Sequence, residues 1–193
     1  MSNRHARARE ALRAAEARTR GDDSAAEARE AAQNGDEAVG QALRVLRRST
    51  QHRPRTEAEV AGKLRQRGYG EAIIEQALAA ARRQGIVDDA AFATAWVQDR
   101  GLKRGFGARR LRDELAGRGV GEADIETALE RLDGRDEQHT AWELARTRAR
   151  QLPADLSYDA LVRRLGSYLM RRGHAPSVAE HAAREVARTA EQG

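Results

Sequence analysis

The 193-residue chain contains no cysteine. That absence excludes disulfide bonds, thiolate metal ligands and a cysteine nucleophile. No apolar run approaches the roughly 18 residues that a membrane-spanning helix needs. Residues 1–20 are rich in arginine and alanine and lack the apolar stretch of a signal peptide. We therefore expect a cytoplasmic protein with no membrane partner.

Aromatic residues make up only 4% of the chain, which also has just three prolines and few β-branched residues. Arginine, alanine and glutamate dominate instead, and these residues lose little freedom on entering a helix. The expected class is all-α. A hydrophobic fraction of 40%, much of it alanine, predicts thin cores, one for each small unit.

A helical pattern recurs three times, each copy centred on a glycine that follows an arginine: Gly68, Gly119 and Gly173. In each copy a leucine stands four residues before the glycine and an alanine nine residues after it. A glycine in this place is typical of the left-handed residue that ends a helix. Repetition at intervals of 51 and 54 residues predicts an elongated array of three tandem three-helix repeats.

The repeats divide the chain into segments. We place the first repeat at residues 38–85, the second at 86–133 and the third at 134–190. Residues 1–37 precede them as an extension that we expect to be a frayed helix or disordered, because it has no apolar stripe wider than alanine. In the third repeat alanines replace larger apolar residues of the first two, so we expect it to be the least well packed.

Basic side chains concentrate in two stretches. Residues 44–67 hold eight bases against two acids, and residues 100–112 hold six bases and no acid. Because the second stretch lacks acids, we expect most of its charges to be unpaired locally and able to contact phosphates or an acidic protein surface. The alternative is a solvated helix face with partners such as Asp99 and Asp113. The candidate binding residues are Arg47, Arg53, Arg55, Lys63, Arg67, Arg100, Lys103, Arg104, Arg109, Arg110 and Arg112.

Other motifs have both a functional and a structural interpretation. The backbone N–H groups of the Gly105–Gly107 turn could form an anion nest, but an interhelical turn is the simpler interpretation. Phe92 and Trp96 could stack on bases, although aromatics at helical spacing more often belong to a core. Asp88 and Asp89 could bind a cation or a partner, but capping of the next helix explains them more simply. We expect no catalytic residue, metal or cofactor.

Several separated strings resemble bacterial RecX regulatory proteins. The central string is Ile86-Val-Asp-Asp-Ala-Ala-Phe-Ala-Thr-Ala-Trp96, and Gly105-Phe-Gly-Ala-Arg-Arg-Leu111 and Gly119-Val120 follow it in the family's order. Upstream, Arg55-Thr-Glu-Ala-Glu-Val60 and Gly68-Tyr69 fit the family's first unit. The resemblance covers roughly residues 38–190.

The resemblance implies a non-enzymatic modulator of the recombinase RecA. Such proteins resemble a curved rod of three three-helix units that lies in the groove of the RecA–DNA filament and bridges neighbouring protomers. Occupying that groove inhibits the ATPase, strand exchange and co-protease activity, which modulates recombination and DNA repair. The expected partners are therefore the RecA filament and single- or double-stranded DNA. We expect the protein to bind them as a monomer. The alternative is a free-standing nucleic-acid-binding helical repeat that acts only by competing for DNA.

Overall fold

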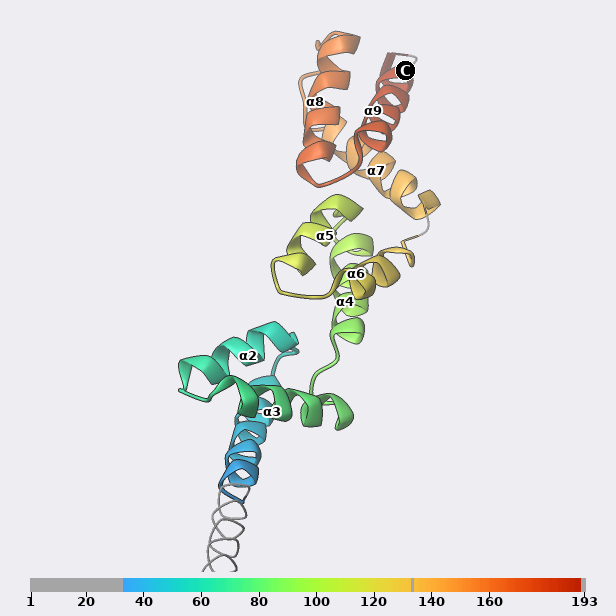
Figure 1. The fold of residues 1–193 in the computed structure, drawn as a ribbon. Helices are drawn as coiled ribbons and strands as arrows, with labels where there is room; N and C mark the ends of the chain where they lie inside the picture. The colour runs from blue at the N-terminus through green and yellow to red at the C-terminus, as the bar shows by residue number, and fades with distance from the viewer. Residues whose placement is uncertain (1–32, 133, 192–193) are drawn as a thin grey trace, which may run out of the picture.

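The computed structural model describes residues 33–132 and 134–191, and every regular element in that part of the chain is a helix. Three groups of helices follow one another along a rod (Figure 1). The prediction of an all-α, elongated array of three tandem three-helix repeats is confirmed. None of the described helices is both long and apolar enough to cross a membrane.

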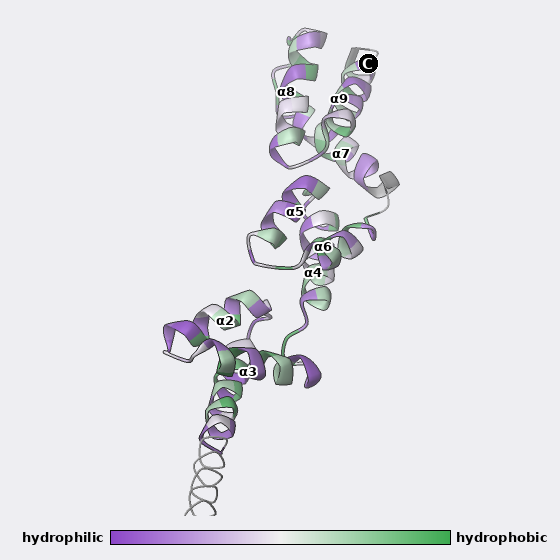
Figure 2. Ribbon diagram, in the orientation of Figure 1, coloured by the Kyte–Doolittle hydropathy of each residue, from purple (hydrophilic) through white to green (hydrophobic). Residues whose placement is uncertain are grey.

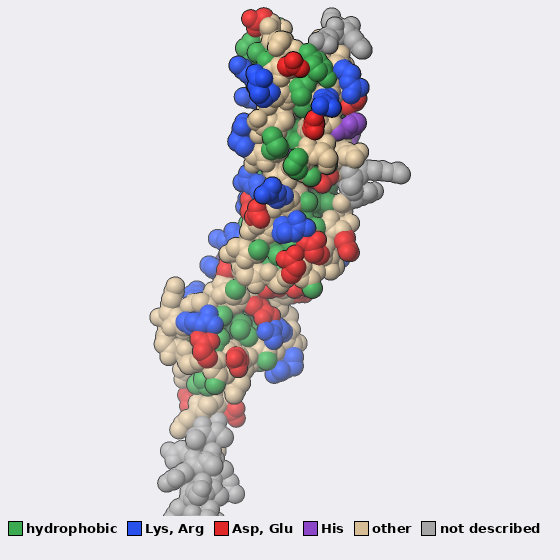
Figure 3. Space-filling model, turned by 45° about the horizontal axis from the view of Figure 1, so that its top comes forward, with side chains coloured by type: hydrophobic (Ala, Val, Ile, Leu, Met, Phe, Trp, Pro, Cys, Tyr) green, Lys and Arg blue, Asp and Glu red, His purple; other side chains and the backbone are tan. Residues whose placement is uncertain are grey.

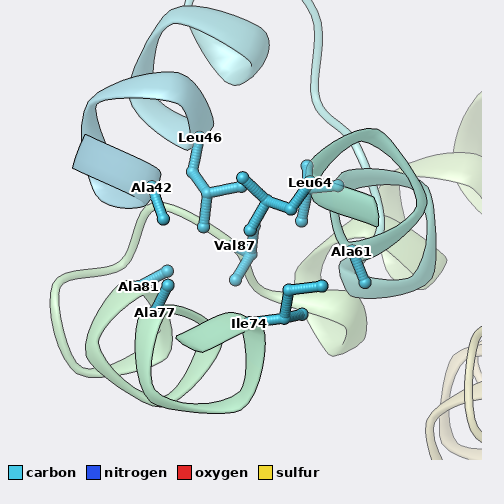
Figure 4. Close-up of a cluster of buried hydrophobic side chains, with 9 residues drawn as sticks. Ala42, Leu46, Ala61, Leu64, Ile74, Ala77, Ala81 and Val87 are labelled. Carbon is cyan, nitrogen blue, oxygen red and sulfur yellow. The ribbon is translucent and has the colours of Figure 1, made fainter. Parts of the chain in front are cut away.

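The first unit consists of a helix over residues 33–50, α2 (Glu57–Gln66) and α3 (Glu71–Arg83). Leu46, Leu64 and Ile74 meet between these helices, together with smaller alanines and Val87 (Figure 4). Residues 33–37, which we had assigned to the extension, continue the first helix. The rest of the predicted extension, residues 1–32, lies outside the described residues.

The second unit consists of α4 (Asp89–Val97), a π-helical turn η1 (Gln98–Leu102), α5 (Ala108–Ala116) and α6 (Glu122–Leu129). The π-helical turn was not predicted. It carries Gly101 into the core, where a Cβ would lie only 3.0 Å from a methyl of Leu132 and 3.3 Å from one of Leu111.

The third unit consists of α7 (Gly134–Ala149), α8 (Tyr158–Arg171) and α9 (Pro176–Glu191). Its core holds eight buried residues, as many as the second core. Five of these eight residues are alanines, against two in the second core, so the expectation that this unit is the least well packed stays a prediction. These helices are longer, and the buried alanines of α9 let α8 pack closely against it.

Hydrophilic and hydrophobic residues alternate along the helices of all three units, as Figure 2 shows. Most of the described helices thus have one face for a core and another for water, whereas α4 is apolar apart from Asp89 and Thr94. Side-chain caps fix where three of the helices begin, since Thr56, Asp88 and Ser157 each accept a hydrogen bond from a backbone N–H of the first turn. The spacing of Thr56 and Glu59 fits a capping box, but the box is only half formed, because Glu59 pairs with Arg118 in the second unit instead of reaching back.

Each middle helix ends in the same three-residue turn, which we call a knuckle: Arg67–Tyr69 after α2, Arg118–Val120 after α5 and Arg172–His174 after α8. In every knuckle the glycine has a positive φ, between 79° and 89°. The residue after it donates its N–H to the leucine carbonyl five residues earlier, at 3.2 Å in all three cases. The predicted left-handed glycines are confirmed, and the repeated geometry follows from them.

The second knuckle docks on the first unit at the start of α2. The Thr56 hydroxyl donates a 2.7 Å hydrogen bond to the Arg118 carbonyl. Gly119 lies so close to Ala58 that a Cβ on the glycine would overlap the Ala58 side chain. Nearby, Asp89 accepts a 2.9 Å hydrogen bond from the Glu57 N–H, and partial burial raises the pKa of its carboxyl. The second unit therefore packs directly against the first.

The third knuckle docks on the second unit in the corresponding place, the start of α5. The N–H of Gly107 donates to the Arg172 carbonyl at 3.0 Å, and the N–H of Arg109 donates to the Gly173 carbonyl at 3.2 Å. A Cβ on Gly107 would overlap the backbone of Gly173 and His174. Gly119 and Gly173, the glycines that end the middle helices of the second and third units, thus also let each unit pack closely against the preceding one.

Candidate binding surface

A groove of about 1120 Å³ lies between the first and second units. The first helix and the loop after it supply a cationic wall, and α4 supplies an aromatic wall of Phe92 and Trp96. Three of the predicted binding residues meet in this groove, and two further arginines join them. The five groove arginines are Arg44, Arg47, Arg48, Arg53 and Arg55.

Three of the groove arginines are available to a ligand. Arg47 donates to the Gln84 side chain, and Arg55 donates to the Ser49 carbonyl at 3.1 Å. Arg44, Arg48 and Arg53 are exposed and have no hydrogen-bonding or ion-pair partner among the described residues. This wall therefore offers unpaired positive charge beside apolar surface.

Neighbouring side chains of the second unit hold the aromatic wall in place. The rings of Phe92 and Trp96 are stacked, with centroids 5.6 Å apart. The guanidinium groups of Arg100 and Arg118 lie 4.1 and 4.2 Å from the Trp96 ring centroid, and its indole N–H donates to Glu114 at 3.0 Å. Both rings are partly buried against the second core, as expected. They also line the groove, where a ligand can reach them.

The second basic stretch differs from expectation. Arg100, Lys103, Arg104, Arg110 and Arg112 each lie within 4.0 Å of a carboxylate. The idea that most of these charges are unpaired is therefore wrong. Some of the acids flank the stretch: Asp99, named above as a possible partner, and Glu114 each stand four residues from the base they pair with. The acids of α6 come close to Arg112 only through the fold, and sequence spacing does not reveal those pairs.

One residue of that stretch remains without such a partner in the described part of the chain. Arg109 is exposed at the start of α5, and its backbone contacts the third knuckle. The exposed ion pairs around it contribute roughly 0–1 kcal/mol each, so a phosphate or an acidic partner could displace their acids.

The Gly105–Gly107 turn does not form an anion nest. Gly105 donates its N–H to the Gly101 carbonyl at 2.9 Å, Phe106 to that of Arg100 at 2.9 Å, and Gly107 to that of Arg172. All three donors are satisfied within the protein. The turn serves to connect helices and to receive the third knuckle, which was the simpler interpretation.

The other two predicted binding residues of the first basic stretch lie outside the groove, as do all six of the second. Lys63 is on α2, and Arg67 forms part of the first knuckle. Asp88 caps α4 through a 2.8 Å hydrogen bond from the Ala91 N–H, as expected.

A basic edge on the third unit escaped the sequence reasoning. Arg163, Arg164 and Arg171 of α8 are exposed, and none has an ion-pair partner among the described residues. Figure 3 shows Lys and Arg side chains along one edge of the rod over the second and third units. The signal was present, because Arg163 and Arg171 stand eight residues apart, which places them on one helix face.

A buried pair joins the second and third units and was also missed. His174 is fully buried, with Nδ1 3.4 Å from Glu137 Oε1 and Nε2 3.3 Å from the Gly105 carbonyl. The His174 imidazole lowers the pKa of the Glu137 carboxyl, the Ala108 N–H adds to this effect, and burial opposes both. The role of the pair is structural, since it lies at the docked third knuckle.

Comparison with known proteins identifies the family. A model of the first three-helix domain of RecX matches residues 51–79, and one of the second three-helix domain matches residues 88–129. The Regulatory protein RecX of Mycobacterium ulcerans is 41% identical over 127 residues, which cover 66% of this chain and 73% of that protein. The chain belongs to the RecX family.

Other RecX proteins extend the match. The Regulatory protein RecX of Thermobifida fusca is 39% identical over 146 residues, or 74% of this chain and 75% of that protein. The crystal structure of RecX from Lactobacillus salivarius superposes with a TM-score of 0.72 at 16% identity, covering 78% of this chain and 97% of that one. That structure establishes the shared fold. The predicted RecX resemblance is confirmed, and these relatives are named as regulatory proteins.

Proposed function

We propose that this RecX protein binds the RecA–DNA filament and inhibits the recombinase, lowering its ATPase, strand exchange and co-protease activity. The observation that carries the proposal is membership of the RecX family at about 40% identity to named regulatory proteins. By this route the protein would modulate recombination and DNA repair without catalysing a reaction itself.

The form of the molecule supports this proposal. A rod of docked units offers an extended surface that can span neighbouring protomers of a filament. Unpaired arginines occur at two separated places on the described rod, in the groove between the first two units and along α8. Electrostatic contacts at two separated places suit a target that repeats along its length.

A second candidate is competition for nucleic acid alone. The groove favours it, because unpaired arginines face a stacked aromatic pair, and backbone-tracking charge beside aromatic rings is how many proteins hold single strands. On this model any effect on RecA would follow from coverage of the DNA.

The RecA ATPase on single-stranded DNA separates the two models. With this protein added below saturation of the DNA, inhibition at ratios far below one protein per DNA site supports filament binding. Inhibition that appears only when naked DNA is covered, and that falls steeply with salt, supports competition. No inhibition at any ratio would contradict the proposal.

The groove can be tested within the same assay. Replacing Arg44, Arg48 and Arg53 by glutamate should raise the half-inhibitory concentration about tenfold or more, equivalent to roughly 1.4 kcal/mol or more of binding. The matched control makes the same charge change at three exposed arginines that do not line the groove: Arg83, Arg131 and Arg184. Equal losses in both variants would show that only net charge matters.

A further inference from the structure

The first knuckle has the geometry of the other two but no partner. Its glycine has φ 83°, and its backbone hydrogen bonds match those of the second and third knuckles. A Cβ on Gly68 would meet no described atom within 4 Å, whereas one on Gly119 or Gly173 would overlap the preceding unit. Arg67 and Gly68 are exposed, and no described group donates to the Arg67 carbonyl.

The start of α8 is the corresponding uncovered receptor. Thr56 accepts from the Glu59 N–H while its hydroxyl donates to the second knuckle, and it is completely buried as a result. Ser157 caps α8 in the same way, accepting from the Ala160 N–H. Its hydroxyl proton has no acceptor among the described residues, and the side chain is exposed.

The charges at the two free ends are complementary. Arg118 of the docked second knuckle pairs with Glu59, the third residue of α2. The equivalent arginine of the first knuckle is Arg67, and Asp159, the second residue of α8, is exposed. An acid one position away along the first turn can reach the same arginine, because the arginine side chain is long and flexible.

We propose that a second copy of this chain places its first knuckle on the start of α8, so that molecules join head to tail. The contact continues the docking interface that already repeats twice within the chain: the Arg67 carbonyl accepts from Ser157, Gly68 lies against the first turn of α8, and Arg67 pairs with Asp159. Because the two surfaces differ, the association is heterologous and can extend into open chains.

The association between copies is weak in free solution. Within the chain, the linker holds consecutive units at an effective concentration of about the millimolar range for short linkers, and a second copy lacks that advantage. We therefore expect dilute protein to be monomeric and chains to form at high local concentration. If the proposed filament binding holds, copies aligned along a filament would meet this condition and bind cooperatively.

Sedimentation velocity without RecA or DNA tests the contact independently of the proposed function. The sedimentation coefficient of the wild-type protein should rise with concentration into the high micromolar range. Arg67→Glu and Asp159→Arg should each remain monomeric, because like charges then meet. An equimolar mixture of the two variants should associate again, since each knuckle then faces an opposite charge. The control Arg164→Glu changes an exposed residue of the same helix and should associate like wild type.

Three results would overturn the proposal. The first is a wild-type sedimentation coefficient that stays constant at every concentration. The second is association of either single variant as strong as wild type, with helicity by circular dichroism unchanged. The third is a mixture that stays monomeric. A constant wild-type value combined with loss of RecA inhibition in Arg67→Glu would assign the first knuckle to the recombinase instead.

Discussion

Replacing Gly119 by alanine should uncouple the first two units. The glycine has φ 79°, where a side chain costs about 1–2 kcal/mol. The added methyl would also overlap Ala58, and such overpacking costs roughly another 1–3 kcal/mol. The expected loss of unfolding free energy is therefore about 2–5 kcal/mol.

Gly68→Ala is a matched control for this change. Gly68 has nearly the same φ, 83°, but no described neighbour within 4 Å of an added Cβ. The Gly68→Ala variant should therefore lose only the unfolding free energy that comes from backbone conformation, about 1–2 kcal/mol. The difference in lost unfolding free energy between the two variants measures the docking contact. Adding Ala58→Gly to Gly119→Ala should recover part of that free energy, which would appear as a favourable coupling energy between the two positions.

The assay is urea unfolding followed by the fluorescence of Trp96, in a background where Trp142 is phenylalanine. Trp96 belongs to the second unit and lies beside Arg118 of the docked knuckle, so it reports on the affected interface. Dilute protein keeps association between copies out of the measurement. Equal losses for the two alanine variants, with no coupling to Ala58, would refute the docking role of Gly119.

Two further predictions concern charges at the junctions. Arg118→Ala should lower stability by about 1–3 kcal/mol, because Glu59 Oε1 would lose its hydrogen bond while Oε2 is already buried without one and has only Arg55, 3.9 Å away, as a cation. Arg112→Ala, which breaks an exposed pair, should lose less than about 1 kcal/mol in the same urea titration. Glu137 has a lowered pKa in the folded protein, so the stability that its ionised form adds is present above the unfolded value near 4.5 and is lost as the pH falls through the folded value. Glu137→Gln should therefore flatten the acid limb of a plot of unfolding free energy against pH, and an unchanged acid limb would contradict the assignment.

The repeats, the helix ends and the caps could be predicted from the sequence because each depends on local chemistry. A positive φ selects glycine, as at Gly68, and a first-turn N–H selects a hydroxyl or carboxylate cap, as at Thr56 and Asp88. Such constraints involve residues a few positions apart. These constraints can be recognised in the sequence without knowing which helices pack together.

Features that depend on distant residues could not be predicted in this way. Glu59 completes a capping box by its spacing, yet in the structure it pairs with Arg118, 59 residues away. The π-helical turn exists where Gly101 packs against Leu132 and Leu111, which local propensity does not encode. The groove likewise forms only when the loop after the first helix faces α4.

Charge counts along the chain also proved a poor guide to exposed charge. The stretch with six bases and no acid, residues 100–112, is mostly paired with acids from its flanks and from α6. Residues 44–67 contain more local acid but leave Arg44, Arg48 and Arg53 unpaired in the described structure. An acidic side chain pairs with a basic one only where the fold brings the two together. Groups of three unpaired arginines lie in the groove and along α8, which are separated along the rod, and this separation supports a partner that is contacted at two places at once.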